Sequence, residues 1–176
     1  MTKLASIDIA VIDFEACDLG AETWPIEAGW IRWCDLEPRS LLIRPHSSFQ
    51  RDLWSMASQR IHGVGLAALD RDGADARFVF AALTEELGDF CVVSDNPAVD
   101  SAWLGRLCRA CDKPPPFAIV DLDEAIFRIG DALSIRPHVA VETFRKAIIA
   151  SDQPPHRAGP DAARLMKALR AIASSA

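Results

Sequence analysis

Acidic residues occur in the sequence where an apolar segment ends. Asp13 and Glu15 form a D-x-E pair at the end of the apolar run SIDIAVIDFEA. Residues two apart on a strand share a face, so both carboxylates should lie on the core-facing side that Ile9 and Val11 also occupy. Two carboxylates side by side at a core repel each other and resist desolvation, so cations, protons or hydrogen-bond donors must stabilise them.

Two further carboxylates and a histidine lie later in the chain, at or beside the starts of predicted helices. Asp100 follows the turn-forming pair Asn96-Pro97 and should lie in the first turn of a helix. A last helix should begin at Pro160, with Gly159 as its cap, and should carry Asp161 on an apolar face. His156 should lie on a loop beside it. Taken singly, these residues are better explained as turn formers, helix-dipole partners or solvated side chains than as catalytic groups; their joint order is more specific.

The elements that would position these residues form an α/β pattern. Strands are predicted over 6–16, 25–35 and 40–46, followed by a polar connection through IHGVG. A helix over 74–87, a strand over 90–95, a helix over 98–111, a strand over 117–122 and helices over 123–130, 138–150 and from 160 onward follow. This order predicts an antiparallel meander within a mixed five-stranded sheet that has helices on both faces. The D-x-E pair would lie at the carboxyl end of a central strand, where open α/β sheets place ligands.

Composition favours one domain over residues 1–176, and no apolar run is long enough to cross a membrane. The five cysteines do not suggest a disulfide framework, so we expect a cytoplasmic protein. A formal charge of −6 disfavours extensive binding to duplex nucleic acid. The charge is uneven, however: residues 1–100 carry 8 basic and 17 acidic side chains, and residues 101–176 carry 11 and 8. A small phosphodiester end therefore stays compatible with the composition.

The order D-x-E, N-x-x-x-D, H-x-x-x-x-D resembles the DEDD-type 3′-5′ exonucleases of the histidine-bearing (DEDDh) subgroup, which have a ribonuclease H-like fold. The resemblance extends from about Ile7 to Leu169 and includes the segment IHG at 61–63. It implies a metal-dependent exonuclease that releases nucleoside monophosphates from single-stranded 3′ ends of DNA or RNA. It also implies a catalytic set in which two divalent cations, Mg²⁺ or Mn²⁺, are held by four carboxylates beside a general base: Asp13, Glu15, Asp100, Asp161 and His156. Such cations prefer carboxylate oxygens.

The same resemblance implies the substrate contacts. The backbone at Phe14 and Ala16 would meet the terminal sugar, and three side chains would line the base: Ile61, His62 and Val99. The chain departs from the family pattern at Ala16, where many relatives have Thr or Ser, and at Asp95, where they have His. It also has Val99 where they have Phe, which removes a stacking contact of about 1–3 kcal/mol per base.

Two alternatives stay open at this point. The chain could be a non-catalytic module of the same fold that binds nucleic-acid ends or a protein, or it could hydrolyse a nucleotide-like small molecule. The sequence does not distinguish DNA from RNA, and it does not specify substrate length, pathway, protein partners or a homodimer. The loop position of His156 suggests the hypothesis that this residue moves into place only when a substrate end is bound.

Overall fold

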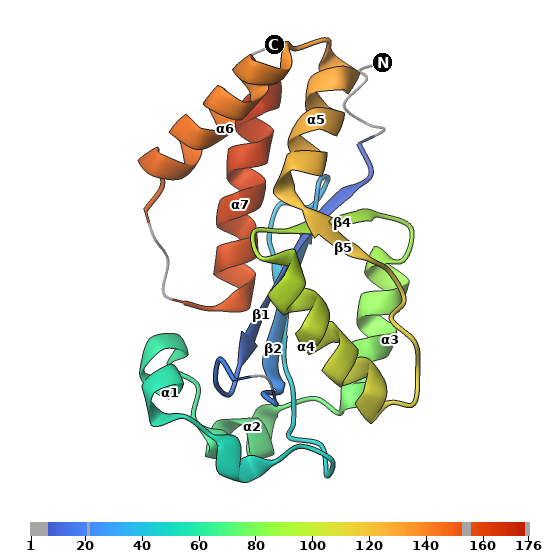
Figure 1. The fold of residues 1–176 in the computed structure, drawn as a ribbon, viewed down its shortest axis with the longest axis vertical. Coiled ribbons are helices and arrows are strands. Elements are labelled where there is room, and N and C mark those ends of the chain that lie inside the picture. The colour runs from blue at the N-terminus through green and yellow to red at the C-terminus, as the bar shows by residue number, and fades with distance from the viewer. Residues whose placement is uncertain (1–6, 21, 153–155, 175–176) are drawn as a thin grey trace.

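The computed structural model describes residues 7–20, 22–152 and 156–174, which contain a five-stranded sheet of order β3-β2-β1-β4-β5 (Figure 1). The first three strands, β1 (Ile9–Ala16), β2 (Pro25–Arg32) and β3 (Arg39–Leu42), form an antiparallel meander. Strand β4 (Cys91–Ser94) pairs in parallel with β1, and β5 (Ile119–Asp121) pairs in parallel with β4. The predicted mixed sheet and its meander are therefore confirmed, and the fold is ribonuclease H-like.

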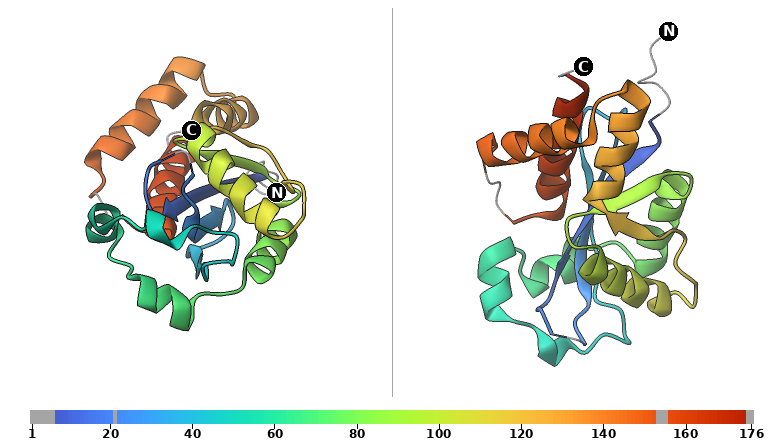
Figure 2. Two further views of the ribbon diagram at one scale, coloured as in Figure 1. Left: turned by 60° about the horizontal axis from the view of Figure 1, so that its bottom comes forward. Right: turned by 45° about the horizontal axis from the view of Figure 1, so that its top comes forward.

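Helices cover both faces of the sheet because β1 is apolar on both sides. Ala10 and Ile12 belong to a core cluster with α3 (Ala76–Leu87) and α4 (Pro97–Ala110). Ile9 and Val11 point the other way, into a cluster with α5 (Leu122–Leu133), α6 (Pro137–Ala150) and α7 (Ala158–Ala173). Figure 2 shows the two sets of helices on opposite sides of the strands. The face of Ile9 and Val11 is also the face that carries Asp13 and Glu15, as the strand period predicts.

The segment after β3 was predicted to be a polar connection, and this prediction was wrong for much of its length. The segment contains a 3₁₀ turn, η2 (Arg51–Leu53), and two short helices, α1 (Met56–His62) and α2 (Leu66–Asp72). These helices lie beyond the end of β1 and the start of β2 (Figure 1). Helix α1 is capped by Ser55, whose hydroxyl oxygen accepts a hydrogen bond from the Ser58 amide at 3.2 Å, and it ends at Gly63 with φ +74°. Helices of seven residues are too short to produce a clear apolar period.

The last helix begins earlier than predicted. Its N-cap is Arg157, and Pro160 lies within the first turn instead of at the first helical position. Carboxylates explain the difference: the Arg157 amide donates to Asp161 Oδ2 at 3.0 Å, and the Ala158 amide donates to Glu27 Oε2 at 3.4 Å. These acceptors satisfy amides that lack partners at a helix start. The two prolines that follow the helix predicted over 138–150, Pro154 and Pro155, lie outside the described residues.

Two simpler expectations can be compared with the structure. None of the helices in residues 7–20, 22–152 and 156–174 is long and apolar enough to span a membrane. All five cysteines are free thiols, and the CxxC pair Cys108 and Cys111 is buried around the end of α4. Cys17 is buried as well, whereas Cys91 is half-buried and Cys34 is exposed.

Candidate metal and catalytic site

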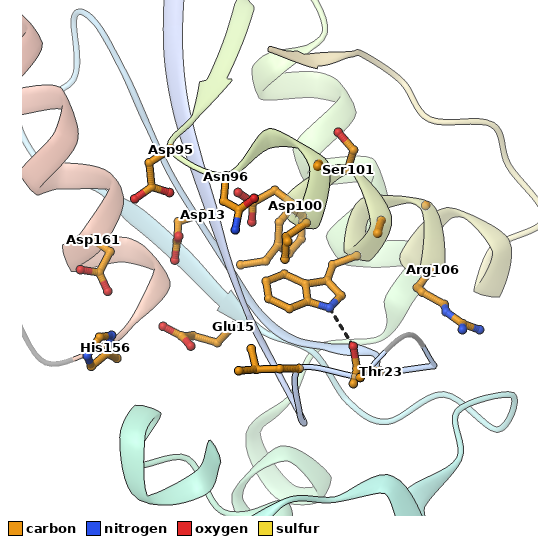
Figure 3. Close-up of a pocket in the computed structure, with 18 of the residues that line it drawn as sticks. Asp13, Glu15, Thr23, Asp95, Asn96, Asp100, Ser101, Arg106, His156 and Asp161 are labelled. Carbon is orange, nitrogen blue, oxygen red and sulfur yellow. Dashed lines mark hydrogen bonds between the residues drawn. The ribbon is translucent and has the colours of Figure 1, made fainter. Parts of the chain in front are cut away.

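The predicted catalytic set comes together at one cavity of about 950 Å³. The cavity opens at the carboxyl ends of β1 and β4, between α4 and the start of α7 (Figure 3). Its lining includes all four predicted carboxylates and the predicted base, which lie far apart in the sequence: Asp13, Glu15, Asp100, Asp161 and His156. Each of the three segments singled out in the sequence therefore contributes to one site.

The carboxylates form two overlapping groups of three. In one group, oxygens of Asp13, Glu15 and Asp161 lie within 4.8 Å of one another. In the other, oxygens of Asp13, Asp95 and Asp100 lie within 4.8 Å of one another. Asp13 belongs to both groups and lies between them, as Figure 3 shows. Two neighbouring places where a cation could be surrounded by oxygen atoms therefore share the Asp13 carboxylate.

Burial and mutual repulsion make these carboxylates difficult to ionise without a cation. The pKa of Asp13 is raised to about 10, first by burial and then by the charges of Asp100, Glu15, Asp161 and Asp95. An ordinary exposed carboxyl titrates near pH 4. The five strongest influences on Asp13 therefore all oppose its ionised form.

The other carboxylates show the same effect to a smaller degree. Burial raises the pKa of Glu15 and of Asp100 to about 7 in each case. Hydrogen bonds from the Ser94 side chain and the Phe14 backbone oppose the shift at Asp100. Burial also raises the pKa of Asp161, and the Arg157 amide and the nearby His156 partly oppose that shift.

This donor set fits hard divalent cations. All the candidate ligand atoms are carboxylate oxygens, which Mg²⁺ and Mn²⁺ prefer over nitrogen or sulfur. Bound cations would also remove the repulsion that raises the pKa of Asp13, because a dication is the largest local charge in such a site. The residues present therefore fit the two-cation site that the sequence pattern implies.

A glycine on β2 allows the last helix to reach this site. Gly29 pairs with Asp13 across β1 and β2, so both residues face α7. A Cβ atom at Gly29 would lie 2.1 Å from the Ala158 carbonyl carbon and 2.2 Å from the Gly159 nitrogen. No side chain fits in that space. Because Gly29 has none, the first turn of α7 packs directly on the sheet and places Asp161 beside Asp13 and Glu15.

A buried ion pair fixes the same turn from the side. Glu27, which is paired with Glu15 across the two strands, has no solvent exposure. Its carboxylate accepts hydrogen bonds from Arg157 Nε at 2.7 Å and Nη2 at 2.8 Å. This bidentate arrangement is the strong form of an arginine–carboxylate pair. It holds the residue that lies between His156 and the α7 helix, so the position of His156 depends on Glu27.

His156 itself is exposed at the cavity wall. It precedes the N-cap of α7 and lies next to Asp161 and Glu15 in Figure 3. Its side chain therefore has access both to the carboxylates and to solvent. This is the arrangement expected for a base that takes a proton from a water molecule beside bound cations.

The predicted substrate-contact residues divide into two groups. Phe14 and Val99 line the cavity with the carboxylates. The other three lie outside its lining: Ala16 is buried in β1, Ile61 is exposed on α1, and His62 is buried at the end of α1. His62 Nδ1 accepts a hydrogen bond from the Val64 amide at 3.1 Å, and its Nε2 has no partner within the described residues.

Several site residues were missed by the sequence analysis. Asp95 was taken only as a departure from the family pattern, although it directly follows β4 and its carboxylate lies with those of Asp13 and Asp100. Glu27 is an isolated carboxylate within an apolar strand, and Gly29 is a glycine in a strand interior, which often marks a close backbone approach. Both were visible signals. The cavity residues on α4 beyond Asp100 gave no such signal: Trp103, Arg106 and Arg109.

No protein-family model matches this sequence, and no curated protein matches it either.

Solved structures do match the fold. The nuclease domain of 3′hExo, a DEDDh family member bound to rAMP, has a TM-score of 0.64 and 21% identity, with 97% of this chain and 94% of that chain covered. A 3′-exonuclease with specific recognition of the histone mRNA stem-loop has a TM-score of 0.67 and 17% identity, over 99% and 66% of the two chains. E. coli Exonuclease I in complex with a dT13 oligonucleotide has a TM-score of 0.66 and 15% identity, and here this chain covers only 41% of its relative. At such identities the likeness is one of fold.

Proposed function

We propose that this chain, whose fold is that of the DEDDh 3′-exonucleases, is a metal-dependent 3′-5′ exonuclease acting on single-stranded 3′ ends of DNA or RNA. The observation that carries the proposal is the cavity itself. Four carboxylates and a histidine from three distant segments line it, and they are the residues to which the family resemblance assigns the catalytic roles: Asp13, Glu15, Asp100, Asp161 and His156. An acidic site of this kind has no evident structural use, because it destabilises its own ionised form.

The residues divide the chemistry between them. The carboxylates of Asp13, Glu15, Asp100 and Asp161 would hold two divalent cations, Mg²⁺ or Mn²⁺, and Asp95 is placed to join the second group. When bound, such cations activate an attacking water and stabilise the leaving oxygen of a phosphodiester. His156 accepts the proton of that water as the oxygen attacks phosphorus. The bond between phosphorus and the 3′ oxygen of the preceding nucleotide breaks and that oxygen takes up a proton from solvent, so a nucleoside 5′-monophosphate leaves and the shortened strand keeps a 3′ hydroxyl.

The relatives support a nucleic-acid substrate. The matched structures include one bound to rAMP, one in complex with dT13 and one with recognition of an mRNA stem-loop. Phe14 and Val99 lie in the cavity where the terminal nucleotide would bind beside the carboxylates. We propose that Ile61 and His62 on α1 and the backbone at Ala16, which do not line the cavity, also contact the nucleotide.

The rival proposal is a non-catalytic module that binds nucleic-acid ends or a protein. It would not need a complete set of ligands, and the described residues contain all four expected carboxylates and the histidine. Hydrolysis of a nucleotide-like small molecule by the same cations is a second rival. An aryl ester of thymidine 5′-monophosphate, a dinucleotide and a ten-nucleotide strand would separate it from an exonuclease.

The test uses 5′-labelled and 3′-labelled single strands of DNA and RNA, incubated with the protein in Mn²⁺ or EDTA. We expect a ladder of shortened 5′-labelled products in Mn²⁺, early release of the 3′ label as a mononucleotide, and no cleavage in EDTA. Asp13→Asn should abolish the ladder. Asp52→Asn is the matched control, because it removes an exposed carboxylate outside the cavity lining.

The outcomes separate the three proposals. Cleavage of neither strand with any divalent cation, together with retained binding of the strands, would favour the binding module. Cleavage of the aryl ester alone would favour the small-molecule enzyme. Cleavage that is equally fast in Asp13→Asn would show that a contaminating nuclease, and not this site, is responsible.

A further inference from the structure

The cavity continues well beyond the carboxylates along α4. Trp103, Arg106 and Arg109 follow Asp100 at intervals of three residues, and all four residues line the same cavity. From Asp100 to Arg109 the helix advances about 13 Å at 1.5 Å per residue. This length exceeds what the phosphate at the cations requires, so the far part of the cavity is available for another part of a substrate.

Trp103 is held in place as a rigid apolar surface. Its indole Nε1 donates a hydrogen bond to Thr23 Oγ1 at 3.0 Å, which the dashed line in Figure 3 marks. Thr23 is itself buried, and the Trp103 side chain packs against the core on its other side. Trp103 lies one turn after Val99, the position at which the expected aromatic residue is missing. It therefore returns an aromatic ring to the cavity from a different position of the helix.

The two arginines extend this surface with positive charge. Arg109 Nη1 would lie 3.4 Å from a Cβ atom at Gly105, so the guanidinium reaches back along the helix over a residue without a side chain. Arg106 forms an ion pair with Glu22 on the loop between β1 and β2. The Glu22 side chain is 64% exposed, so its carboxylate competes with any phosphate that approaches Arg106.

Charge in the cavity is thus separated along its length. The carboxylates gather where β1 and β4 meet α7, and Arg106 lies at the opposite side, with an indole between them (Figure 3). Grooves that combine basic and aromatic side chains bind single strands, because arginines contact phosphates and bases stack on the rings. The arrangement therefore continues from the cation-binding end in the way a strand leading to a 3′ end requires.

We infer that Trp103, Arg106 and Arg109 form a strand-binding row that takes the nucleotides preceding the one removed. A base stacks on Trp103, and phosphates of the strand contact the two arginines. The inference rests on the proposed function for the direction of the strand. It makes strands of several nucleotides, and not isolated nucleotide esters, the preferred substrate class.

The test measures binding separately from hydrolysis. A fluorescein-labelled ten-nucleotide thymidine strand is titrated with protein in Ca²⁺, the integrity of the strand is checked on a gel, and fluorescence anisotropy is followed at several salt concentrations. Each lost phosphate contact should reduce the slope of log K against log salt by about 0.7. The double variant Arg106→Gln/Arg109→Gln should therefore lose about 1.4 from the slope and bind about tenfold more weakly at low salt. Arg145→Gln, an exposed arginine on α6, is the matched control.

Substitutions at Trp103 and at Glu22 should have effects of opposite sign. Trp103→Ala should weaken binding about tenfold, and Trp103→Phe should restore most of it because a ring remains for stacking. Glu22→Gln should strengthen binding, because it removes the carboxylate that competes for Arg106. Thermal unfolding of each variant shows whether the fold is retained.

The results separate this inference from the proposed function. If the wild type shortens strands but the double variant keeps its salt slope and affinity, the row does not bind the strand and the inference is overturned. The same holds if the double variant slows hydrolysis of the aryl ester of thymidine 5′-monophosphate as much as that of the ten-nucleotide strand. If the strand binds through the row but is never cleaved, the exonuclease proposal fails and the row stands.

Discussion

Glu27 on β2 accepts two hydrogen bonds from Arg157, at 2.7 and 2.8 Å, and thereby joins the sheet to the residue that precedes α7. The carboxylate is fully buried, and the arginine side chain is 36% exposed. Neither residue belongs to the expected ligand set. Their contact nevertheless fixes the segment that carries His156 and Asp161, so Glu27 is a positioning residue.

Glu27→Gln should lower both stability and turnover. Removing one charge of a largely buried pair leaves the other uncompensated and costs about 3 kcal/mol. Because Glu27 does not line the cavity, its loss should act through His156 and Asp161 and reduce kcat at least tenfold with little change in KM. The Mn²⁺ concentration for half-maximal activity should rise. Steady-state kinetics at several Mn²⁺ concentrations would measure kcat, KM and the Mn²⁺ concentration for half-maximal activity.

Glu86→Gln supplies the control for this prediction. Glu86 accepts hydrogen bonds from Arg39 at 2.6 Å and Trp30 Nε1 at 2.8 Å, but it lies outside the cavity lining. Glu86→Gln should therefore lower stability without changing kcat. If Glu27→Gln behaved in the same way, the pair would have a structural role only.

His156→Ala should separate proton transfer from metal binding. We expect kcat to fall by about 10²–10⁴-fold, the usual contribution of a general base. The rise in melting temperature caused by Mn²⁺ should remain, because the carboxylates are unchanged. Kinetics and thermal unfolding of the same preparations would check both expectations. His138→Ala, an exposed histidine on α6, should leave both quantities as in the wild type. Loss of the Mn²⁺ effect in His156→Ala would show that His156 is needed to organise the ligands.

The stability of the metal-free protein should fall as pH rises. The folded chain keeps Asp13 protonated up to about pH 10, and Glu15 and Asp100 up to about pH 7, whereas in the unfolded chain they ionise near pH 4. Unfolding therefore releases protons in this range, and each such group lowers the free energy of unfolding by up to about 1.4 kcal/mol per pH unit. Between pH 7 and 9 Asp13 still contributes to this decrease in the free energy of unfolding, whereas Glu15 and Asp100 are already ionised in the folded chain.

Urea unfolding in EDTA from pH 5 to pH 9 would test this dependence. Asp13→Asn should make the protein more stable than the wild type at pH 8 and should flatten the slope above pH 7. Asp52→Asn, which changes an exposed carboxylate, should keep the wild-type slope. Saturating Mn²⁺ should reverse the sign for the wild type, because the cation binds the ionised carboxylates. A metal-free stability that rises with pH over this range would contradict the burial of Asp13 as a protonated group.

Gly29→Ala should disconnect α7 from the site. The added methyl group would overlap the backbone at Ala158 and Gly159, so the first turn of α7 must move away from the sheet. We expect a loss of about 3 kcal/mol of stability, at the upper end for overpacking. We also expect loss of the stabilisation by Mn²⁺, because Asp161 moves with the turn. Gly65→Ala is the matched control, since the nearest atom to its Cβ would be Gln59 Nε2 at 3.8 Å.

Alternation and turn residues were sufficient to predict the sheet and the main helices. Residues such as Ile9 and Val11 repeat with the strand period, and the resulting topology places strand ends at one edge. The segment with α1 and α2 was not predicted, because two helices of seven residues each produce too few turns for a period to be recognised. Local patterns thus determine elements of ordinary length and fail for short ones.

The candidate ligands could be predicted because their joint order resembles that of a known family and each has a recognisable place, such as the end region of β1 for Asp13 or the turn before Asp100. The contacts that support the site could not be predicted in this way. Glu27 and Arg157 are 130 residues apart, and their contact exists only after α7 has packed on β2. The start of α7 was misplaced for the same reason: Glu27 and Asp161 accept hydrogen bonds from its first amides, and the bond from Ala158 to Glu27 bridges two distant segments.

The side-chain-free surface of Gly29 has a consequence for how the protein becomes active during synthesis. Asp13 and Glu15 are made first, but the turn that packs on Gly29 and carries Asp161 belongs to the last helix of the described chain. A nascent chain that has not yet exposed residues 158–173 lacks Asp161, and the sheet face of Ile9 and Val11 lacks the apolar side chains of α7. If the proposed function holds, the active site therefore stays incomplete until residues 158–173 have left the ribosome and packed on the sheet.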